Sequence, residues 1–176
     1  VVFEHATTKD AVDYVLSQDT HMGCTITAHH LVINRTDIFK SGIRPHLYCL
    51  PIAKREVHRQ ALRAAATSGD KRVFLGTDTA PHPVHAKESD CGCAGIFSAP
   101  TAMEIYTQVF DEEGALDQLE AFASTNGPGF YGLAVNEGTV TLVRDVADAP
   151  ERIETAEGET VMVFRPDAGL NWRMTA

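Results

Sequence analysis

The spacing of hydrophobic residues predicts short buried strands that alternate with amphipathic helices over the first 80 residues. Three apolar runs, at residues 1–5, 24–28 and 73–77, have the length and composition of strands buried on both faces. Between them, apolar residues recur every three or four positions, around residues 11–16 and over residues 52–68. Buried strands joined by helices are typical of a parallel sheet. The pattern therefore predicts an α/β fold.

Local signals indicate where the helices begin and end. Capping residues at 7–10 precede the first helix. Pro51 suits the first turn of the second helix, and Gly69 suits its C-terminal cap. Residues 32–50 predict an irregular loop with a short extended piece at 47–50, and residues 79–99 predict a second loop rich in Gly and Cys. The remaining expected elements are helices over 100–112 and 116–125 and strands over 139–144 and 160–165.

Polar residues follow each of the three predicted strands. They are His5, the pair His29 and His30, and Asp78 with His82. In α/β folds the carboxyl ends of the strands build the active site, so we expect a polar site there. A complete (β/α)₈ barrel takes about 250 residues. The chain has 176 residues and begins without Met inside a predicted strand, which favours the last piece of such a barrel.

Each candidate residue also has a structural interpretation, which the residues alone leave open. His5 could bind a metal or be an ordinary hydrogen-bonded histidine. Asp78 is costly to bury after an apolar strand unless a metal, a cation or backbone N–H groups compensate its charge. His82 and His85 have a His-x-x-His spacing, which is weak evidence on a loop with prolines. Cys91 and Cys93 supply two ligands where a structural zinc site needs four, which disfavours such a site.

Composition narrows the class of partner and compartment. The formal net charge is −9, from 15 Lys and Arg against 24 Asp and Glu, which argues against a nucleic-acid partner. No apolar run approaches the roughly 20 residues of a membrane helix, and the first residues do not resemble a signal peptide. The four cysteines are therefore predicted to be reduced thiols, with Cys24 and Cys49 buried. We expect a cytoplasmic protein with no membrane partner.

Several longer motifs resemble dihydroorotases of the single-domain bacterial type, in order along nearly the whole chain. The central match is Val-Phe-Leu-Gly-Thr-Asp-Thr-Ala-Pro-His at residues 73–82. The resemblance implies a (β/α)₈ barrel of the amidohydrolase superfamily, of which residues 1–138 would hold about strands 6–8 and their helices. Residues 139–176 would form a C-terminal extension packed on the barrel. The other matching segments are residues 3–11, 44–51, 87–89, 91–95, 126–128 and 130–132.

The resemblance also implies roles for individual residues. His5 would be a zinc ligand, and Asp78 would be both a zinc ligand and the catalytic base. Leu50 and Ala94, through their backbones, and His82 would contact the substrate. The family binds two zinc ions bridged by a carboxylated lysine. That lysine, a His-x-His pair and further ligands would lie before residue 1, so we expect this chain to be inactive without an N-terminal barrel half.

The implied reaction is the reversible cyclisation of N-carbamoyl-L-aspartate to dihydroorotate in pyrimidine biosynthesis. A hydroxide bridging the two metals would attack the ring carbonyl. Asp78 would take its proton and return it to the amide nitrogen. The family further implies a homodimer. Two alternatives stay open: another cyclic amidase such as an allantoinase or hydantoinase, and a non-catalytic, dihydroorotase-like scaffold partner of aspartate transcarbamoylase.

Overall fold

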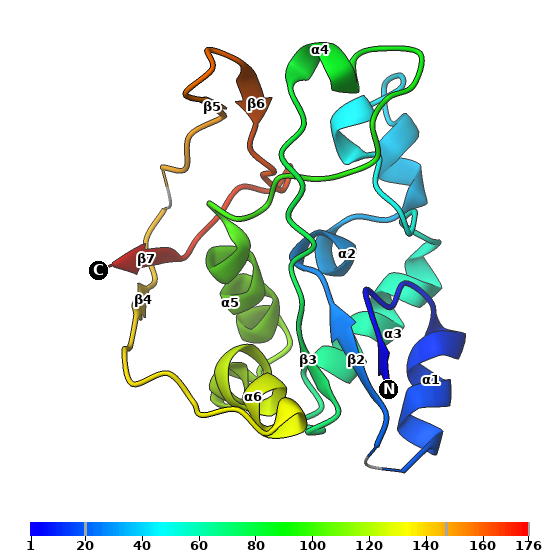
Figure 1. Cartoon of the computed structure of the whole chain (residues 1–176), viewed down its shortest axis with the longest axis vertical. Coiled ribbons are helices and arrows are strands. Elements are labelled where there is room, and N and C mark those ends of the chain that lie inside the picture. The colour runs from blue at the N-terminus through cyan, green and yellow to red at the C-terminus, as the bar shows by residue number, and fades with distance from the viewer. Residues whose placement is uncertain (20, 147, 176) are drawn as a thin grey trace.

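Three parallel strands form the centre of the computed structural model, which describes residues 1–19, 21–146 and 148–175. They are β1 (Val2–Phe3), β2 (Gly23–Ile26) and β3 (Val73–Leu75), in the order β1-β2-β3 (Figure 1). Both neighbouring pairs are parallel. The predicted α/β fold with a parallel sheet is therefore confirmed. The first run was wrongly predicted to be buried, because β1 pairs only with β2 and leaves Val1 and Phe3 exposed.

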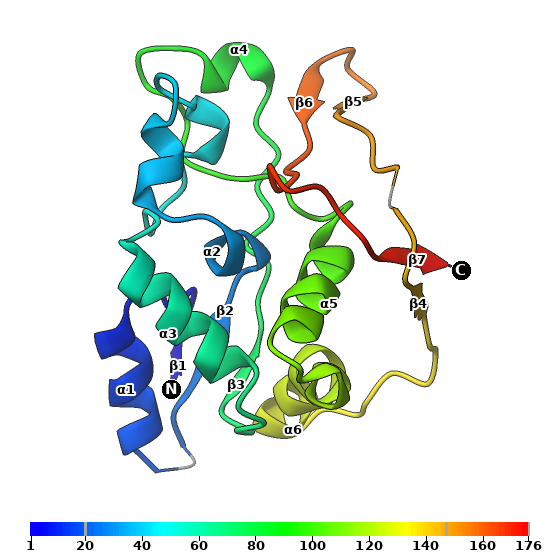
Figure 2. The ribbon, with the colours of Figure 1, turned by 180° about the vertical axis from the view of Figure 1, so that it is seen from behind.

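Helices α1 (Lys9–Ser17) and α3 (Glu56–Ala66) connect the strands. Thr8 caps α1 as predicted, since its hydroxyl accepts the N–H of Ala11 at 3.0 Å. Helix α3 passes in front of β1 and β2 in Figure 2 and behind them in Figure 1, so it covers one face of the sheet.

The predicted start of α3 near Pro51 was wrong. Tertiary hydrogen bonds use the backbone of residues 51–54 and keep it out of the helix. The carbonyl of Pro51 lies 2.9 Å from His30 Nε2, and the carbonyl of Lys54 accepts the N–H of Arg35 at 2.8 Å. The helix therefore begins only at Glu56.

The region after β2 also differs from its prediction. His29 and His30 lie in a short helix, α2 (Ala28–Val32), which is capped by the Thr27 side chain, and not at the end of a strand. The predicted extended piece at residues 47–50 is only partly confirmed, because Leu47 ends a 3₁₀ helix while Tyr48 has extended backbone angles. The predicted loop over residues 32–50 contains two 3₁₀ helices, η1 (Arg35–Phe39) and η2 (Pro45–Leu47). Pro45 supplies the fixed φ that suits the first turn of η2.

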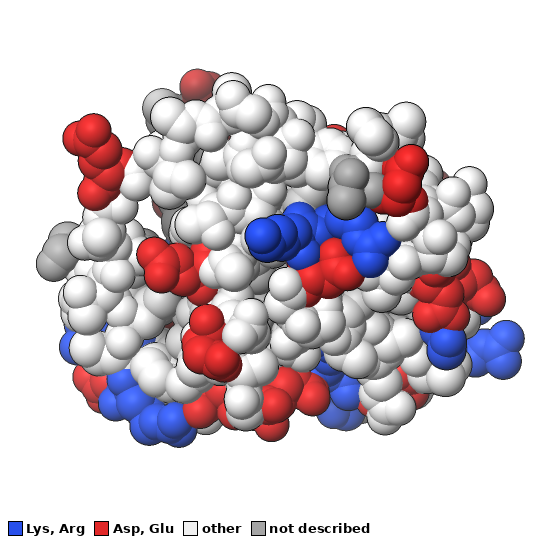
Figure 3. Space-filling view, turned by 90° about the horizontal axis from the view of Figure 1, so that it is seen from below, with Lys and Arg blue, Asp and Glu red and all other residues white. Residues whose placement is uncertain are grey.

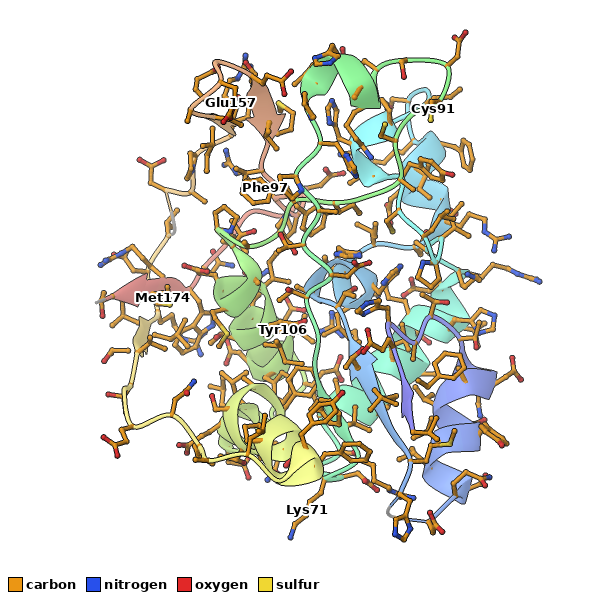
Figure 4. The ribbon with its side chains drawn as sticks, viewed as in Figure 1. Lys71, Cys91, Phe97, Tyr106, Glu157 and Met174 are labelled. Atoms are coloured by element: carbon orange, nitrogen blue, oxygen red, sulfur yellow. The ribbon has the colours of Figure 1, made fainter. Side chains whose placement is uncertain are left out.

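After β3 the chain forms mostly helices. The predicted loop at 79–99 contains a short helix, α4 (Val84–Lys87), and the predicted helix at 100–112 is confirmed as α5 (Ala102–Glu112). Tyr106 of α5 is fully buried and donates its hydroxyl to the carbonyl of Ile26 at 2.8 Å, so it fixes α5 against β2 (Figure 4). The helical segment that follows comprises the 3₁₀ helix η3 (Leu116–Gln118), the π-helix η4 (Ala121–Thr125) and α6 (Asn126–Tyr131).

The tail forms two small antiparallel sheets. The predicted strands are confirmed as β4 (Thr141–Val143) and β6 (Thr160–Met162). Each pairs with a short strand that was not predicted: β7 (Arg173–Thr175) with β4, and β5 (Arg152–Glu154) with β6. The tail is fastened near the loop after β3, since the N–H of Phe164 donates to the carbonyl of Phe97 at 2.8 Å.

Charged residues of both signs lie side by side at one end of the molecule. Figure 3 shows the end of the molecule at which β3 begins, where Lys and Arg lie beside Asp and Glu. The ion pair between Arg72 and Asp70, 2.6 Å apart, is an example.

All four cysteines are free, and Cys24 and Cys49 are buried as predicted. Among the described residues, every helix is too short or too polar to cross a membrane.

Candidate active site

His5 and Asp78 meet just beyond the ends of β1 and β3. The Nε2 atom of His5 lies 3.9 Å from an Oδ1 atom of Asp78, and the two side chains are 21% and 37% exposed. Both residues have positive φ angles, 54° and 43°. Such angles are uncommon for residues with a side chain and cluster at functional sites. The fold therefore brings together the two residues predicted to bind metal.

Thr25 of β2 sets the orientation of the His5 ring. Its hydroxyl accepts the backbone N–H of His5 at 2.7 Å and lies 3.2 Å from His5 Nδ1. Nε2 is left facing Asp78 and Glu4, whose carboxylate is 3.4 Å away. Gly76 permits this packing, because a Cβ atom there would lie 2.5 Å from the Thr25 Cβ. Metal-binding histidines are commonly held in this way, with one ring nitrogen hydrogen-bonded and the other free.

The separation of these two groups suits metal binding. Ligand atoms about 2.0–2.2 Å from one zinc ion lie roughly 3–4 Å apart. The 3.9 Å between His5 Nε2 and Asp78 Oδ1 therefore fits two ligands of one ion or of neighbouring ions in a pair. Two ligands are fewer than the four that zinc prefers, so the remaining ligands would have to come from outside this chain.

The three residues predicted to contact substrate lie on segments that are joined by hydrogen bonds. His82 Nε2 lies 3.1 Å from the carbonyl of Ala94, and the N–H of Gly95 donates to the carbonyl of Tyr48 at 3.0 Å. The latter bond joins the loop around Ala94 to the segment that carries Leu50. Within the described ranges, no hydrogen bond uses the backbone N–H of Leu50 or of Ala94. Both groups therefore keep an unused donor within this part of the chain.

A second cluster, of His29, His30 and Cys49, has ligand atoms within 4.8 Å of one another. Both ring nitrogens of His30 are already engaged, Nδ1 with the Thr27 hydroxyl at 2.7 Å and Nε2 with the carbonyl of Pro51. Burial raises the pKa of the Cys49 thiol to about 11, so the thiol is neutral near pH 7. We therefore interpret this cluster as structural. His30 ties α2 to the segment next to Leu50, a role that the sequence did not reveal.

The buried histidines should make the protein lose stability in mild acid. Burial lowers the pKa of His30 from 6.5 to about 4 and that of His29 well below its ordinary value. The unfolded chain therefore binds these protons first, and stability should fall as the pH drops from 6.5 towards 4. For His30 the loss should approach about 3 kcal/mol.

Urea unfolding at pH 7 and pH 4.5 measures this effect in a full-length protein carrying the chain. The difference in unfolding free energy between the two pH values should shrink in His30→Gln. The control His21→Gln changes a histidine that is 90% exposed, and it should behave as wild type. An equal pH dependence in all three proteins would contradict the explanation.

Comparison with known sequences identifies close relatives, although no family model matches the chain. It is 58% identical over 174 residues to a dihydroorotase from Erythrobacter litoralis, covering 99% of the chain and 50% of the relative. It is also 58% identical over 172 residues to a dihydroorotase from Cronobacter sakazakii, covering 98% of the chain and 49% of the relative. The chain thus spans about half the length of the curated relatives it matches.

Solved structures agree with these sequences. A Saccharomyces cerevisiae dihydroorotase in complex with 5-fluoroorotic acid superposes with a TM-score of 0.88 at 28% identity, over 99% of this chain and 50% of that one. A Campylobacter jejuni dihydroorotase gives a TM-score of 0.86 at 32% identity, over 99% and 51%. An Arthrobacter aurescens L-hydantoinase, at 18% identity and a TM-score of 0.69, shares the fold, with 97% of this chain and 41% of that one covered.

The predicted architecture is confirmed by these matches. The three βα units are the C-terminal portion of a (β/α)₈ barrel, because each solved relative matches this chain almost completely with only about half of its own length. The sequence relatives share well over half of their aligned residues with the chain. The chain is therefore similar, over nearly its whole length, to about half of each of these dihydroorotases.

Proposed function

We propose that this chain is the C-terminal half of a dihydroorotase, which interconverts N-carbamoyl-L-aspartate and dihydroorotate. The observation that carries the proposal is the 3.9 Å approach of His5 and Asp78 at the ends of two barrel strands. Relatives named dihydroorotase at 58% identity support it. In this proposal an N-terminal barrel half completes the site. From family resemblance we further propose a cytoplasmic homodimer in pyrimidine biosynthesis.

In this proposal the metal centre contains two zinc ions. His5 Nε2 and a carboxylate oxygen of Asp78 would bind them from this chain, and the N-terminal half would supply the carboxylated lysine and the other ligands. Bound zinc would lower the pKa of water towards 7 and polarise the carbonyl that is attacked. Support comes from the donor types, an imidazole and a carboxylate, and from the Thr25 hydroxyl that orients His5.

Asp78 would carry the proton during ring opening and closure. Its carboxylate stands at a strand end with a side chain 37% exposed, so a carboxylate oxygen is accessible to a reactant. It would accept a proton from water during attack and deliver it to the amide nitrogen that leaves. In ring closure the same oxygen would take the proton from that nitrogen.

The substrate would be held by backbone and side-chain groups of three neighbouring segments. The N–H groups of Leu50 and Ala94 are candidates because no hydrogen bond within the described part of the chain uses them. A dihydroorotate ring offers carbonyl oxygens and a carboxylate as acceptors for such donors. His82, fixed 3.1 Å from the carbonyl of Ala94, would help to neutralise that carboxylate.

We also propose a division at residue 138, with a barrel segment over 1–138 and an extension over 139–176. The two small sheets of the tail lie outside the parallel sheet. The extension is fastened to the barrel segment at Thr101, whose hydroxyl donates to the carbonyl of Phe164 at 2.7 Å. The extension would hold the end of the loop at residues 79–99 in place.

A substrate panel tests the proposed activity. A full-length protein carrying this chain should hydrolyse dihydroorotate and bind about two zinc ions per subunit, while hydantoin, allantoin and dihydrouracil should react far more slowly. The isolated chain is the control and should show no turnover. Steady-state rates and elemental analysis on the same samples give both results.

Two outcomes would replace the proposal. A preference for hydantoin or allantoin would assign another cyclic amidase activity. No turnover of any substrate, together with tight binding to aspartate transcarbamoylase, would assign a non-catalytic scaffold.

A further inference from the structure

Lys87, at the end of α4, is a buried cation enclosed by backbone carbonyls. The residue is only 3% exposed. Its Nζ donates to the carbonyls of Tyr48 at 2.8 Å, Cys93 at 2.6 Å and Gly95 at 2.8 Å. These three bonds use all the donors of an ammonium group. The Tyr48 ring, 5.7 Å from Nζ, adds a favourable contact with the cation.

The environment of Lys87 explains why the three carbonyls converge. None of the ion pairs formed by the described residues involves Lys87. An ammonium group buried without a carboxylate is costly unless dipoles replace its water. Burial accordingly lowers the pKa of Lys87 below its ordinary value. The charge is therefore compensated by three carbonyl oxygens. All three bind the same atom, Lys87 Nζ, which holds them close together.

The carbonyls bound by Lys87 belong to the two segments that carry Leu50 and Ala94. Tyr48 lies two residues before Leu50, while Cys93 and Gly95 flank Ala94 on both sides. The peptide bond between Cys93 and Ala94 is planar and trans, so its C=O and N–H groups point in opposite directions. When Lys87 binds the carbonyl of Cys93, it turns the N–H of Ala94 away from itself.

Few other polar contacts hold this part of the loop. Over residues 90–94, the hydrogen bonds within the described part of the chain are those of the Cys93 carbonyl to Lys87 and of the Ala94 carbonyl to His82. Cys93 has a positive φ angle of 22°, which residues with side chains rarely adopt without such restraints, whereas Gly92 adopts its φ of 69° freely. Lys87 thus connects the part of the loop around Ala94 to the Tyr48 segment, together with the Gly95 N–H that donates to the carbonyl of Tyr48.

We propose that Lys87 is a positioning residue for substrate binding, which fixes the backbone N–H of Ala94 relative to the Leu50 segment. The inference rests on the proposed dihydroorotase function. Lys87 itself is enclosed by protein carbonyls, and none of the hydrogen bonds formed by the described residues joins it to His5 or Asp78. Its loss should therefore weaken binding of the substrate more than it slows the chemical step.

The first test compares Lys87→Met with Lys71→Met in a full-length enzyme carrying this chain. Lys71 is an exposed lysine at the bottom of Figure 4, at the opposite end of the molecule from α4 at the top of Figure 1. Lys87→Met keeps most of the side-chain length and removes the charged group. KM for dihydroorotate should rise about tenfold to a hundredfold, with a smaller change in kcat and unchanged metal content. Lys71→Met should match wild type.

A second readout separates this inference from the proposed function. Amide hydrogen exchange at Gly95, whose N–H donates to the carbonyl of Tyr48 at 3.0 Å, should become at least tenfold faster in Lys87→Met, whether or not the protein turns over dihydroorotate. If wild type has no dihydroorotase activity, the proposed function fails, while faster exchange still supports the positioning of the loop. Unchanged exchange, or an unchanged KM in an active enzyme, would overturn the proposal.

Chemical rescue distinguishes positioning from a general loss of stability. Lys87→Ala leaves space for the three carbon atoms and the ammonium group of n-propylammonium. Added n-propylammonium should restore a low KM in a saturable way, whereas 1-propanol, which is uncharged, should not. A fall in kcat with lost zinc and no rescue would show that Lys87 acts on the metal centre, and the proposal would be wrong.

Discussion

Replacing Asp78 by Asn in a full-length enzyme should abolish most of its dihydroorotase activity without unfolding it. The amide has nearly the same shape as the carboxylate, but it cannot take a proton from water at neutral pH. General base catalysis contributes about 10²–10⁴-fold, so kcat should fall by about three orders of magnitude. The proposed ligand role would add to this loss, because Asp78 also faces His5 at 3.9 Å.

Measurements of kcat and of zinc content on Asp78→Asn separate its two proposed roles. A loss of kcat with both zinc ions retained would assign the residue mainly as the proton carrier. A loss of one zinc ion would assign it mainly as a ligand. The control Asp90→Asn alters an exposed carboxylate of the same loop and should keep wild-type kcat and thermal stability. Wild-type turnover in Asp78→Asn would show that the residue has neither role.

Gly95→Ala should damage substrate binding and stability together. A Cβ atom at this position would lie 2.6 Å from the Ala80 Cβ and 2.7–2.8 Å from two atoms of the His82 ring. The φ angle of +154° is also one that residues with side chains rarely adopt. Crowding and backbone strain each cost on the order of 1–3 kcal/mol, and the His82 ring is the group most able to move.

The expected result for Gly95→Ala is a KM for dihydroorotate raised at least about tenfold and a melting temperature lowered by several degrees. Gly114→Ala is the matched control, because Gly114 also has a positive φ, +68°, but a Cβ there would meet nothing within 4 Å. It should lower the melting temperature slightly and leave KM unchanged. If both variants change KM equally, displacement of His82 is not the cause.

Sequence patterns alone identified the parts of the molecule that depend on local chemistry. The apolar runs predicted β2 and β3, since a strand buried on both faces is apolar without interruption. The recurrence of apolar residues every three or four positions predicted α1 and the body of α3, because only one face of each helix is buried. The placement of His5 and Asp78 after parallel strands implied that they share one edge of the sheet, and the fold brings them to 3.9 Å.

Other features depend on contacts between residues far apart in the chain. Pro51 looked like the start of a helix, yet hydrogen bonds to His30 and Arg35 hold residues 51–54 outside it. The strands β5 and β7 are three residues each and were not predicted, because their pairing partners decide their conformation. Local propensity is worth less than about 1 kcal/mol per residue, so a few tertiary bonds override it.

The same division holds for the site. The chemical groups of His5, Asp78 and His82 were visible in the sequence, because in the proposed function their side chains would act directly on a metal, a proton or an anion. The contacts of Thr25 and Lys87 were not visible in the sequence, because their partners lie far along the chain. Thr25 binds His5, 20 positions away, and Lys87 binds Tyr48, 39 positions away. A lysine in a short helix has no local signal of burial. Only the tertiary structure surrounds it with three carbonyls and so decides what it does.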